Sequence, residues 1–308
     1  MSERRPAVVM EPARREEMAA AFRLLFQHLA ENDRETRVAN ALKMLRDKEL
    51  DPAGMLVARA ERELRGALFY QPVAGASGLI WPPQTQPAPM AEVEDQLVNH
   101  ACRRLAEQGA KLVQSLLSPE ESSLLGASLE RNGFSHITQL RYLRHDLQFS
   151  PRFFQSPDAL SYQTYASCVA EQFHQTLLRT YEATLDCPEV NDVRKIEEII
   201  AGHKSQGRYN PESWWLASHQ DQPVGVLLLA EVPDLKSWDL LYLGVPPEAR
   251  GKGFGRELAR KALWEARASE APQLTLSVDT RNQPALNLYE SVGFEPYDQR
   301  KVFLRILK

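Results

Sequence analysis

The chain has 308 residues, of which 43% are hydrophobic and 25% charged, as in a soluble globular protein with a sizeable core and one large or two smaller domains. Its formal net charge of −4 excludes the strongly basic character of a nucleic-acid-binding chain, and no apolar run reaches the ~18 residues that would span a membrane. The N-terminus lacks the apolar segment of a secretory signal and the three cysteines show no metal-ligand spacing, so we expect a cytoplasmic protein that binds neither nucleic acid, membrane nor metal.

The first half of the chain alternates helical and strand-like segments. Apolar residues recur at helical spacing between Glu16 and Leu50. A proline-rich stretch, ASGLIWPPQTQPAPM at 76–90, is expected to break regular structure. The remaining pattern predicts strands at 54–61, 65–73, 110–118 and 140–147, and helices at 91–109 and 118–133, the last of which opens with a cap-like Ser-Pro-Glu-Glu.

The second half repeats this order of segments, and two short echoes support the repeat. WPP at 81–83 resembles VPP at 245–247, and LERNGF at 129–134 resembles YESVGF at 289–294. The offset is roughly constant, and we therefore interpret the chain as an internal duplication of two α/β domains.

The two predicted domains are residues 1–150 and 151–308, divided within a linker at 148–159. In the second domain the pattern predicts strands at 160–165, 238–245, 273–279 and 301–307, a hairpin at 213–232, and helices at 168–186, 192–204, 253–269 and 283–293.

A glycine-rich segment, RGKGFG at 250–255, separates a predicted strand from a predicted helix. Glycine allows positive φ and a close approach of backbone to ligand. The free N–H groups and the dipole at the start of a helix favour an anion, and Arg250 and Lys252 add positive charge. Because the spacing matches neither a P-loop nor a dinucleotide fingerprint, the segment predicts a different site for a pyrophosphate.

Two motifs in the second half resemble signatures of the GNAT superfamily of acyl-CoA-dependent N-acyltransferases. Arg250-x-x-Gly253-x-Gly255 resembles the family motif Q/R-x-x-G-x-G/A, and NQPALNLYESVGF, at 282–294, resembles N-x-x-A-x-x-L-Y-x-x-x-G-F. The first half resembles the same fold weakly. The resemblance implies a tandem α/β protein, α+β in some schemes, whose two GNAT-like domains each have a mixed, mostly antiparallel sheet flanked by helices.

The resemblance also implies an acetyl-CoA site in the second domain. Backbone N–H groups of the glycine segment would hold the pyrophosphate, and the preceding strand would bind the pantetheine arm and polarise the thioester carbonyl near Val245. Asn282 would fix the neighbouring strand and loop. The residues expected at the cofactor are Leu243, Gly244, Val245, Arg250, Gly251, Lys252, Gly253, Phe254, Gly255, Arg256, Asn282 and Tyr289.

Tyr289 resembles the general acid of the family, which would protonate the departing CoA thiolate. Without the motif, a core aromatic on an amphipathic helix would be the simpler interpretation. The general base stays open between Asp239, Glu231 and Asp279, each of which lies at the end of a predicted strand, where a solvated charge is the commoner role. Asp239 is the first choice, because some relatives carry a glutamate base on that strand.

The first domain is predicted to have lost the acetyl-CoA site. The segment aligned with the glycine loop carries Glu92, Glu94 and Asp95, whose charges would repel phosphates. The position matching Tyr289 is Leu129, which cannot donate a proton. We expect this domain to be structural or to shape the acceptor site.

The function expected from these features is transfer of an acetyl group from acetyl-CoA to a primary amine of a small molecule or peptide. The loop LDCPEVND carries Asp186, Glu189 and Asp192, which would suit a cationic amine, although a solvated loop is the simpler interpretation. A non-catalytic acyl-CoA sensor or scaffold is the alternative. The identity of the acceptor, the acyl length and the oligomeric state are left open.

Overall fold

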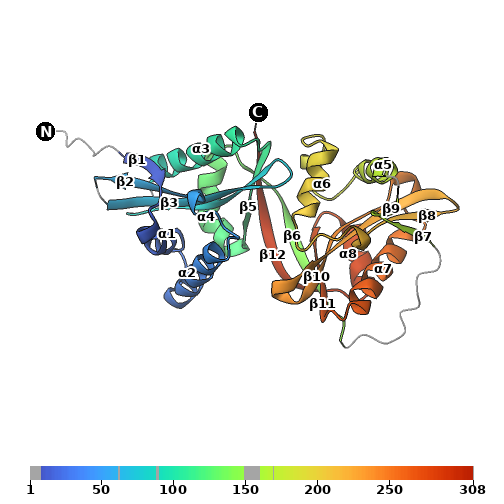
Figure 1. Cartoon of the computed structure of the whole chain (residues 1–308). Helices are drawn as coiled ribbons and strands as arrows, with labels where there is room; N and C mark the ends of the chain where they lie inside the picture. The colour runs from blue at the N-terminus through green and yellow to red at the C-terminus, as the bar shows by residue number, and fades with distance from the viewer. Residues whose placement is uncertain (1–7, 62, 88–89, 149–159, 169, 308) are drawn as a thin grey trace. The chain divides into compact units, whose positions relative to one another are not determined.

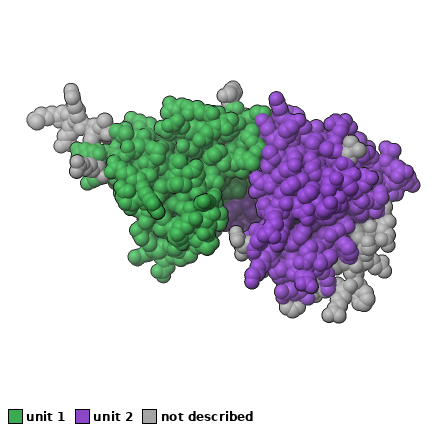
Figure 2. Space-filling model, viewed as in Figure 1, with its two compact units in different colours: residues 1–137, 301–308 green, residues 138–300 purple. Residues whose placement is uncertain are grey.

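The computed structural model describes residues 8–61, 63–87, 90–148, 160–168 and 170–307. The chain divides into two compact units, shown in different colours in Figure 2: residues 1–137 with 301–308, and residues 138–300. Almost all of the predicted linker at 148–159 lies outside the described residues. In the described part of the chain, no helix combines the length and the apolar character needed to cross a bilayer.

Unit 1 is a twisted sheet with a pair of helices on each face (Figure 1). Its strands run in the order β1-β2-β3-β4-β5-β12, and all their pairings are antiparallel except β4 with β5. α1 and α2 cover one face and α3 and α4 the other, because alternate residues of β2 and β3 are buried on opposite sides. The elements are β1 (Val8–Pro12), α1 (Met18–Leu25), α2 (Glu31–Arg46), β2 (Met55–Ala60), β3 (Glu63–Val73), β4 (Ser77–Thr85), α3 (Ala91–Glu107), β5 (Leu112–Leu117) and α4 (Pro119–Arg131).

Unit 2 repeats this architecture in the second half of the chain. Its strands run in the order β6-β11-β10-β9-β8-β7, and the β10–β11 pairing is parallel. α7 and α8 pack on one face of the sheet and α5 and α6 on the other. The elements are β6 (Ser135–Asp146), β7 (Ser161–Thr164), α5 (Ala170–Thr180), α6 (Ile196–Lys204), β8 (Trp214–His219), β9 (Gln222–Val232), β10 (Ser237–Gly244), α7 (Phe254–Ala268), β11 (Gln273–Asp279), α8 (Gln283–Ser291) and β12 (Glu295–Ile306).

Each half of the chain gives its last strand to the other unit. β6 ends the first half, yet its residues from Leu140 to Asp146 pair antiparallel with β11 in unit 2. β12 ends the second half, and its residues from Lys301 to Ile306 pair with β5 in unit 1. The compact units therefore differ from the predicted domains 1–150 and 151–308, because the terminal strands are exchanged.

The proline-rich stretch at 76–90, predicted to break regular structure, instead contains β4. The pairing of β4 with β3 skips from Gln84 to Trp81, so that Pro82 and Pro83 fall at an irregularity of the ladder. Proline has no N–H to donate and is tolerated in a strand at such a bulge. The prediction failed because Pro82 and Pro83 fall at an irregularity in the pairing, so the strand continues past them.

The predicted correspondence of WPP with VPP is also wrong, although the duplication itself is confirmed by the matching order of strands and helices in both halves. β4 begins at Ser77 and β10 at Ser237. WPP at 81–83 lies inside β4, whereas VPP at 245–247 follows the end of β10. WPP therefore matches the middle of β10, which has a bulge of its own.

Candidate active site

The parallel strands β10 and β11 separate partway along unit 2. They pair only at Trp238 with Leu274 and at Asp239 with Thr275. Beyond this point β10 has a bulge, since Leu240 and Tyr242 face consecutive residues of β9, and a bulge bends a strand. A cavity of about 690 Å³ opens where the strands diverge, and it is lined by β10, the end of β11, the glycine segment and α8.

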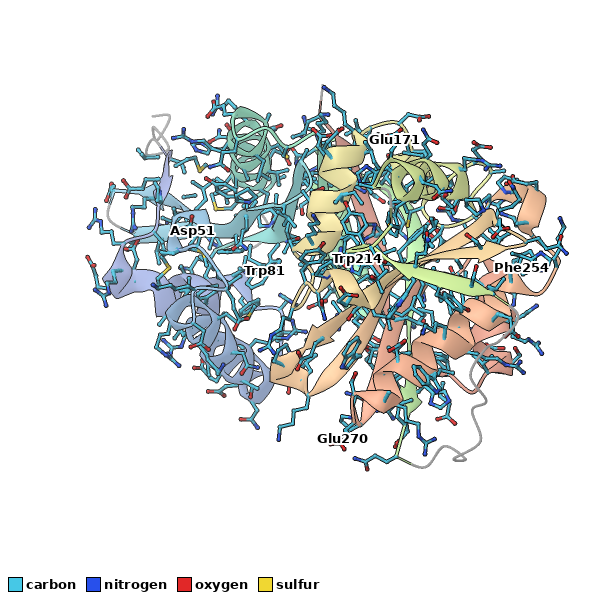
Figure 3. All side chains as sticks on the ribbon, turned by 45° about the vertical axis from the view of Figure 1, so that its right-hand side comes forward. Asp51, Trp81, Glu171, Trp214, Phe254 and Glu270 are labelled. Carbon is cyan, nitrogen blue, oxygen red and sulfur yellow. The ribbon has the colours of Figure 1, made fainter. Side chains whose placement is uncertain are left out.

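The glycine segment at the start of α7 has the backbone that its sequence predicts. Gly251 and Gly253 have φ of +76° and +86°, which glycine adopts without strain. No atom lies within 4 Å of the Cβ that either residue lacks, so their open faces can receive a ligand. Gly253 is the N-cap of α7 and has no side chain to accept the first N–H groups of the helix. Phe254, labelled in Figure 3, opens the helix and lines the cavity.

Arg250 does not point its charge at this anion site, contrary to the prediction that it adds positive charge there. Its guanidinium donates hydrogen bonds to four backbone carbonyls: Thr180 at 3.1 Å, Glu182 at 2.7 Å, Ala183 at 3.1 Å and Val245 at 3.0 Å. The first three lie at the last residue of α5 and just after it, where the last carbonyls of the helix lack helical partners and attract a cation. Arg250 therefore ties the glycine segment to the end of α5.

Besides Arg250, the exposed cations at the start of α7 are Lys252 and Arg256. Arg256 donates to the hydroxyl of Ser291 on α8 at 3.2 Å. These two side chains, rather than Arg250, can supply positive charge beside a phosphate.

We expect Arg250→Met to lower the free energy of unfolding by about 1–3 kcal/mol, because it removes charge-assisted hydrogen bonds that are partly exposed. It should also weaken acetyl-CoA binding, because the glycine segment loses its anchor. Urea denaturation and calorimetric titration measure the two effects. Lys252→Met is the matched control, which should weaken binding without lowering stability. Equal stability of the two variants would contradict the anchoring role.

The strand residues predicted for the pantetheine arm lie along the cavity. Leu243, Gly244 and Val245 all line it. A Cβ on Gly244 would lie 2.6–2.7 Å from atoms of Tyr242 and Thr180, so only glycine fits there. Asn282 also lines the cavity and caps α8, its side-chain oxygen accepting the N–H of Ala285 at 3.2 Å. This cap fixes the start of the helix that carries Tyr289.

Tyr289 lies where both interpretations left open by the sequence are compatible with its surroundings. It is a residue of α8 buried in the core that α7 and α8 form with the sheet, with its ring 5.6 Å from that of Phe294. It also lines the cavity beside the diverging strands. Burial raises the pKa of its phenol, and the negative charge of Asp186 adds to the rise. The phenol is therefore protonated at neutral pH, as a proton donor must be.

The three carboxylates weighed as the general base lie in different surroundings. Asp279 is fully buried and bound by Arg281 and by the hydroxyl of Thr138. Burial alone would raise the pKa of Asp279, but these hydrogen bonds outweigh it and hold the pKa below its usual value. Glu231 forms an ion pair with Arg208 at 2.9 Å. Neither is placed to take a proton from a bound amine.

Asp239, the first choice, accepts a hydrogen bond from Thr275 at 3.0 Å where β10 and β11 are still paired. Burial raises the pKa of its carboxyl. Its side chain is not among the groups that line the cavity, whereas that of Asp186 is. The sequence predicts Asp186 only as part of a loop near the acceptor. No motif marks it, because the α5–α6 loop approaches β11 only in the folded chain.

A cluster of possible metal ligands lies at the same place. One ligand atom each of Asp186, Cys187 and Asp279 lies within 4.8 Å of the others. Arg281 binds both carboxylate oxygens of Asp279, and its positive charge stands where a cation would balance the carboxylate. The cluster is therefore explained without a metal ion.

The corresponding region of unit 1 is filled by its own side chains. At the start of α3, Glu94 binds Arg131 at 2.7 Å and approaches the hydroxyl of Thr85 at 3.4 Å. Asp95 accepts from Arg131 at 3.2 Å. Leu129, on α4, is completely buried. Two of the three acidic side chains predicted to repel phosphate, Glu94 and Asp95, are thus paired with Arg131, whereas Glu92 is exposed.

The part of the chain that contains this cavity is similar to known acetyltransferases. The acetyltransferase (GNAT) family model matches residues 171–294, which include the cavity of unit 2. The peptidyl-lysine N-acetyltransferase YjaB of Escherichia coli K12 is 32% identical over 119 residues, covering 38% of this chain and 69% of that protein. The chain belongs to the GNAT acetyltransferase family. As a GNAT N-acetyltransferase it is expected to use acetyl-CoA.

Longer similarities extend into the first half of this GNAT protein. A mycothiol acetyltransferase of Thermomonospora curvata is 28% identical over 223 residues, covering 68% of this chain and 73% of that one. A GCN5-related N-acetyltransferase structure from Sphaerobacter thermophilus has a TM-score of 0.63 at 18% identity, covering 97% of this chain and 95% of that one. A tandem GNAT protein from the clavulanic acid biosynthesis pathway has a TM-score of 0.50 at 14% identity, covering 97% and 98%. The predicted tandem GNAT fold is confirmed.

Proposed function

We propose that unit 2 transfers the acetyl group of acetyl-CoA to a primary amine by direct attack within a ternary complex. The observation that carries the proposal is the continuity of one cavity, which runs from the glycine segment, along Leu243–Val245, to Tyr289. A pyrophosphate would bind the N–H groups at the start of α7. The pantetheine arm would follow β10 toward the point where the strands diverge.

The chemistry follows from what lies at that point. A backbone N–H near Val245 would stabilise the oxygen on which negative charge develops as the amine attacks. Tyr289 would donate its phenolic proton to the CoA thiolate as the C–S bond breaks. The acceptor is a primary amine of a small molecule or peptide. One relative is named for acetylation of peptidyl-lysine and another for mycothiol, and this chain acts on an amine of this broad class.

Unit 1 contributes structure rather than a second acetyl-CoA site. Its equivalent of the glycine segment presents Glu94 and Asp95, already paired with Arg131, and Leu129 stands where unit 2 has Tyr289. A phosphate placed there would meet two carboxylates, and like charges repel.

The test is calorimetric titration of the full chain with acetyl-CoA. We expect one site per chain, and Gly253→Glu should weaken binding roughly 100-fold, because a carboxylate then faces the pyrophosphate. Gly109→Glu is the matched control: Gly109 lies in unit 1, has φ of +88° and has no atom within 4 Å of its missing Cβ. Two sites would overturn the assignment of unit 1, and no binding would overturn the proposed function.

A further inference from the structure

Asp186 is held rigidly at the wall of the cavity, although no family motif includes it. The α5–α6 loop and the end of β11 exchange two hydrogen bonds: the N–H of Asp279 donates to the Asp186 carboxylate at 3.2 Å, and the N–H of Cys187 donates to the Asp279 carboxylate at 3.0 Å. Glu189 of the same loop binds Arg281 at 2.6 Å. The loop therefore places Asp186 in the cavity with little freedom to move.

The two neighbouring aspartates have opposite surroundings. Asp279 is bound by Arg281 and stays ionised. Asp186 accepts one backbone hydrogen bond, and burial together with the charge of Asp279 raises the pKa of its carboxyl. Carboxylates whose environments drive their pKa values apart mark different roles in proton transfer. Asp279 fixes the geometry, and Asp186 is the group that can exchange a proton.

We propose that Asp186 is the group that accepts the proton which the acceptor ammonium loses before it attacks the thioester. This inference rests on the proposed acetyl transfer. Asp186 shares the cavity with Tyr289 and Val245, so the proton acceptor, the proton donor and the backbone that polarises the carbonyl all line one cavity. Asp239 lies outside the lining, at the part of β10 still paired with β11.

The proton balance requires both groups. An ammonium, R–NH₃⁺, gives one proton to the Asp186 carboxylate, and the freed lone pair forms the N–C bond while the carbonyl pair moves to oxygen. The tetrahedral intermediate collapses with cleavage of the C–S bond, and Tyr289 protonates the sulfur. The second nitrogen proton restores the phenol, and Asp186 releases its proton to solvent. The products are an N-acetyl amine, CoA–SH and one proton.

The charges around Asp186 are compatible with this role. Its negative charge raises the pKa of Tyr289, which keeps the phenol protonated for its own step. When Asp186 takes up the ammonium proton, that influence disappears and the phenol becomes a stronger acid as the thiolate forms. The titratable and charged groups that face it are Asp279 at the end of β11, Arg281 just after that strand, Cys187 in its own loop, Tyr181 just after α5, Tyr242 on β10 and Tyr289 on α8.

The kinetic test uses two amines on the full chain, butylamine and methoxyamine, with release of CoA thiol as the readout. Butylamine is charged at pH 7 and needs a base, whereas methoxyamine is already neutral. We expect Asp186→Asn to lower kcat/KM for butylamine about 10²–10⁴-fold, the usual contribution of a general base, and to affect methoxyamine far less. The loss for butylamine should diminish as the pH rises, because free amine becomes abundant.

Two controls separate catalysis from folding. Asp221→Asn alters an exposed aspartate of the β8–β9 turn, at a φ of +60° that asparagine tolerates, and should change neither rate. Asp239→Asn should lower kcat/KM for butylamine less than Asp186→Asn does. An equal loss with both amines, or a larger loss in Asp239→Asn, would overturn the role of Asp186. If the wild-type chain acetylates none of butylamine, methoxyamine and a lysine-containing peptide, both the proposed acetyl transfer and this inference are wrong.

A second measurement needs no acceptor. In the CoA complex, carboxyl-¹³C aspartate resonances of the wild type and of Asp186→Asn differ by one signal, which is Asp186. We expect that signal to titrate above the ordinary aspartate value of about 3.9. Titration at or below that value would overturn the inference while leaving the acetyl-transfer proposal intact.

Discussion

Tyr289→Phe is expected to lower acetyl transfer about 10²–10⁴-fold, the range that general acid catalysis contributes, while the affinity for acetyl-CoA stays near that of the wild type. The ring of Tyr289 packs in the core of unit 2, and phenylalanine keeps that packing. Only the proton donor is lost, so the CoA thiolate must leave without protonation. Steady-state rates of CoA release and calorimetric titration with acetyl-CoA measure the two quantities.

The matched control is Tyr209→Phe, since Tyr209 packs against Trp214 in the other core of unit 2 and does not line the cavity. It should retain the wild-type rate. If Tyr289→Phe releases CoA at the wild-type rate, Tyr289 is not the general acid and serves only as a core aromatic residue. A wild-type chain that binds acetyl-CoA and transfers it to no amine would instead favour a sensor or scaffold.

The parts of the site that depend on local sequence could be predicted from it. Gly251 and Gly253 adopt positive φ at the start of α7, as a glycine-rich segment between strand and helix indicates. Asn282 and Tyr289 lie on one short helix, so their spacing fixes their relation. Apolar runs predicted the central strands of unit 2, because helices cover both faces of the sheet and β8 and β9 are buried in continuous stretches.

The parts that depend on distant contacts could not be predicted in this way. Arg250 belongs to the motif, but three of its four partners are carbonyls about 70 residues earlier in the chain, at and just after the end of α5. Asp186 reaches the cavity only because its loop exchanges hydrogen bonds with β11. A resemblance in sequence says which residues are present, whereas the direction of a side chain depends on the partners that the fold brings to it.

The exchange of terminal strands is the largest feature that local pattern leaves undetermined. β6 and β12 occupy matching positions in the two halves, and both are strands of 12 residues. Either could pair with β5 or β11, since both neighbours offer an antiparallel edge. Nothing in the periodicity of a strand states which edge it joins.

This exchange predicts that cutting the chain at the boundary expected from sequence will destroy the fold of the catalytic half. A fragment of residues 151–308 loses β6, whose residues from Leu140 to Asp146 pair with the whole of β11. β11 would become an unpaired edge beside the cavity, and such an edge promotes aggregation. We expect the fragment to be aggregated or largely unfolded by size-exclusion chromatography and circular dichroism, with no measurable acetyl-CoA binding.

A fragment of residues 138–300 is the decisive comparison, because it keeps every residue of unit 2 and omits the part of β12 that pairs in unit 1. It is shorter at its C-terminus than the first fragment and lacks part of the second half, yet we expect it to fold cooperatively and to bind acetyl-CoA. A folded, binding-competent 151–308 fragment would show that β11 does not need β6. If only the 138–300 fragment binds, the functional unit is defined by strand pairing rather than by the repeat in the sequence.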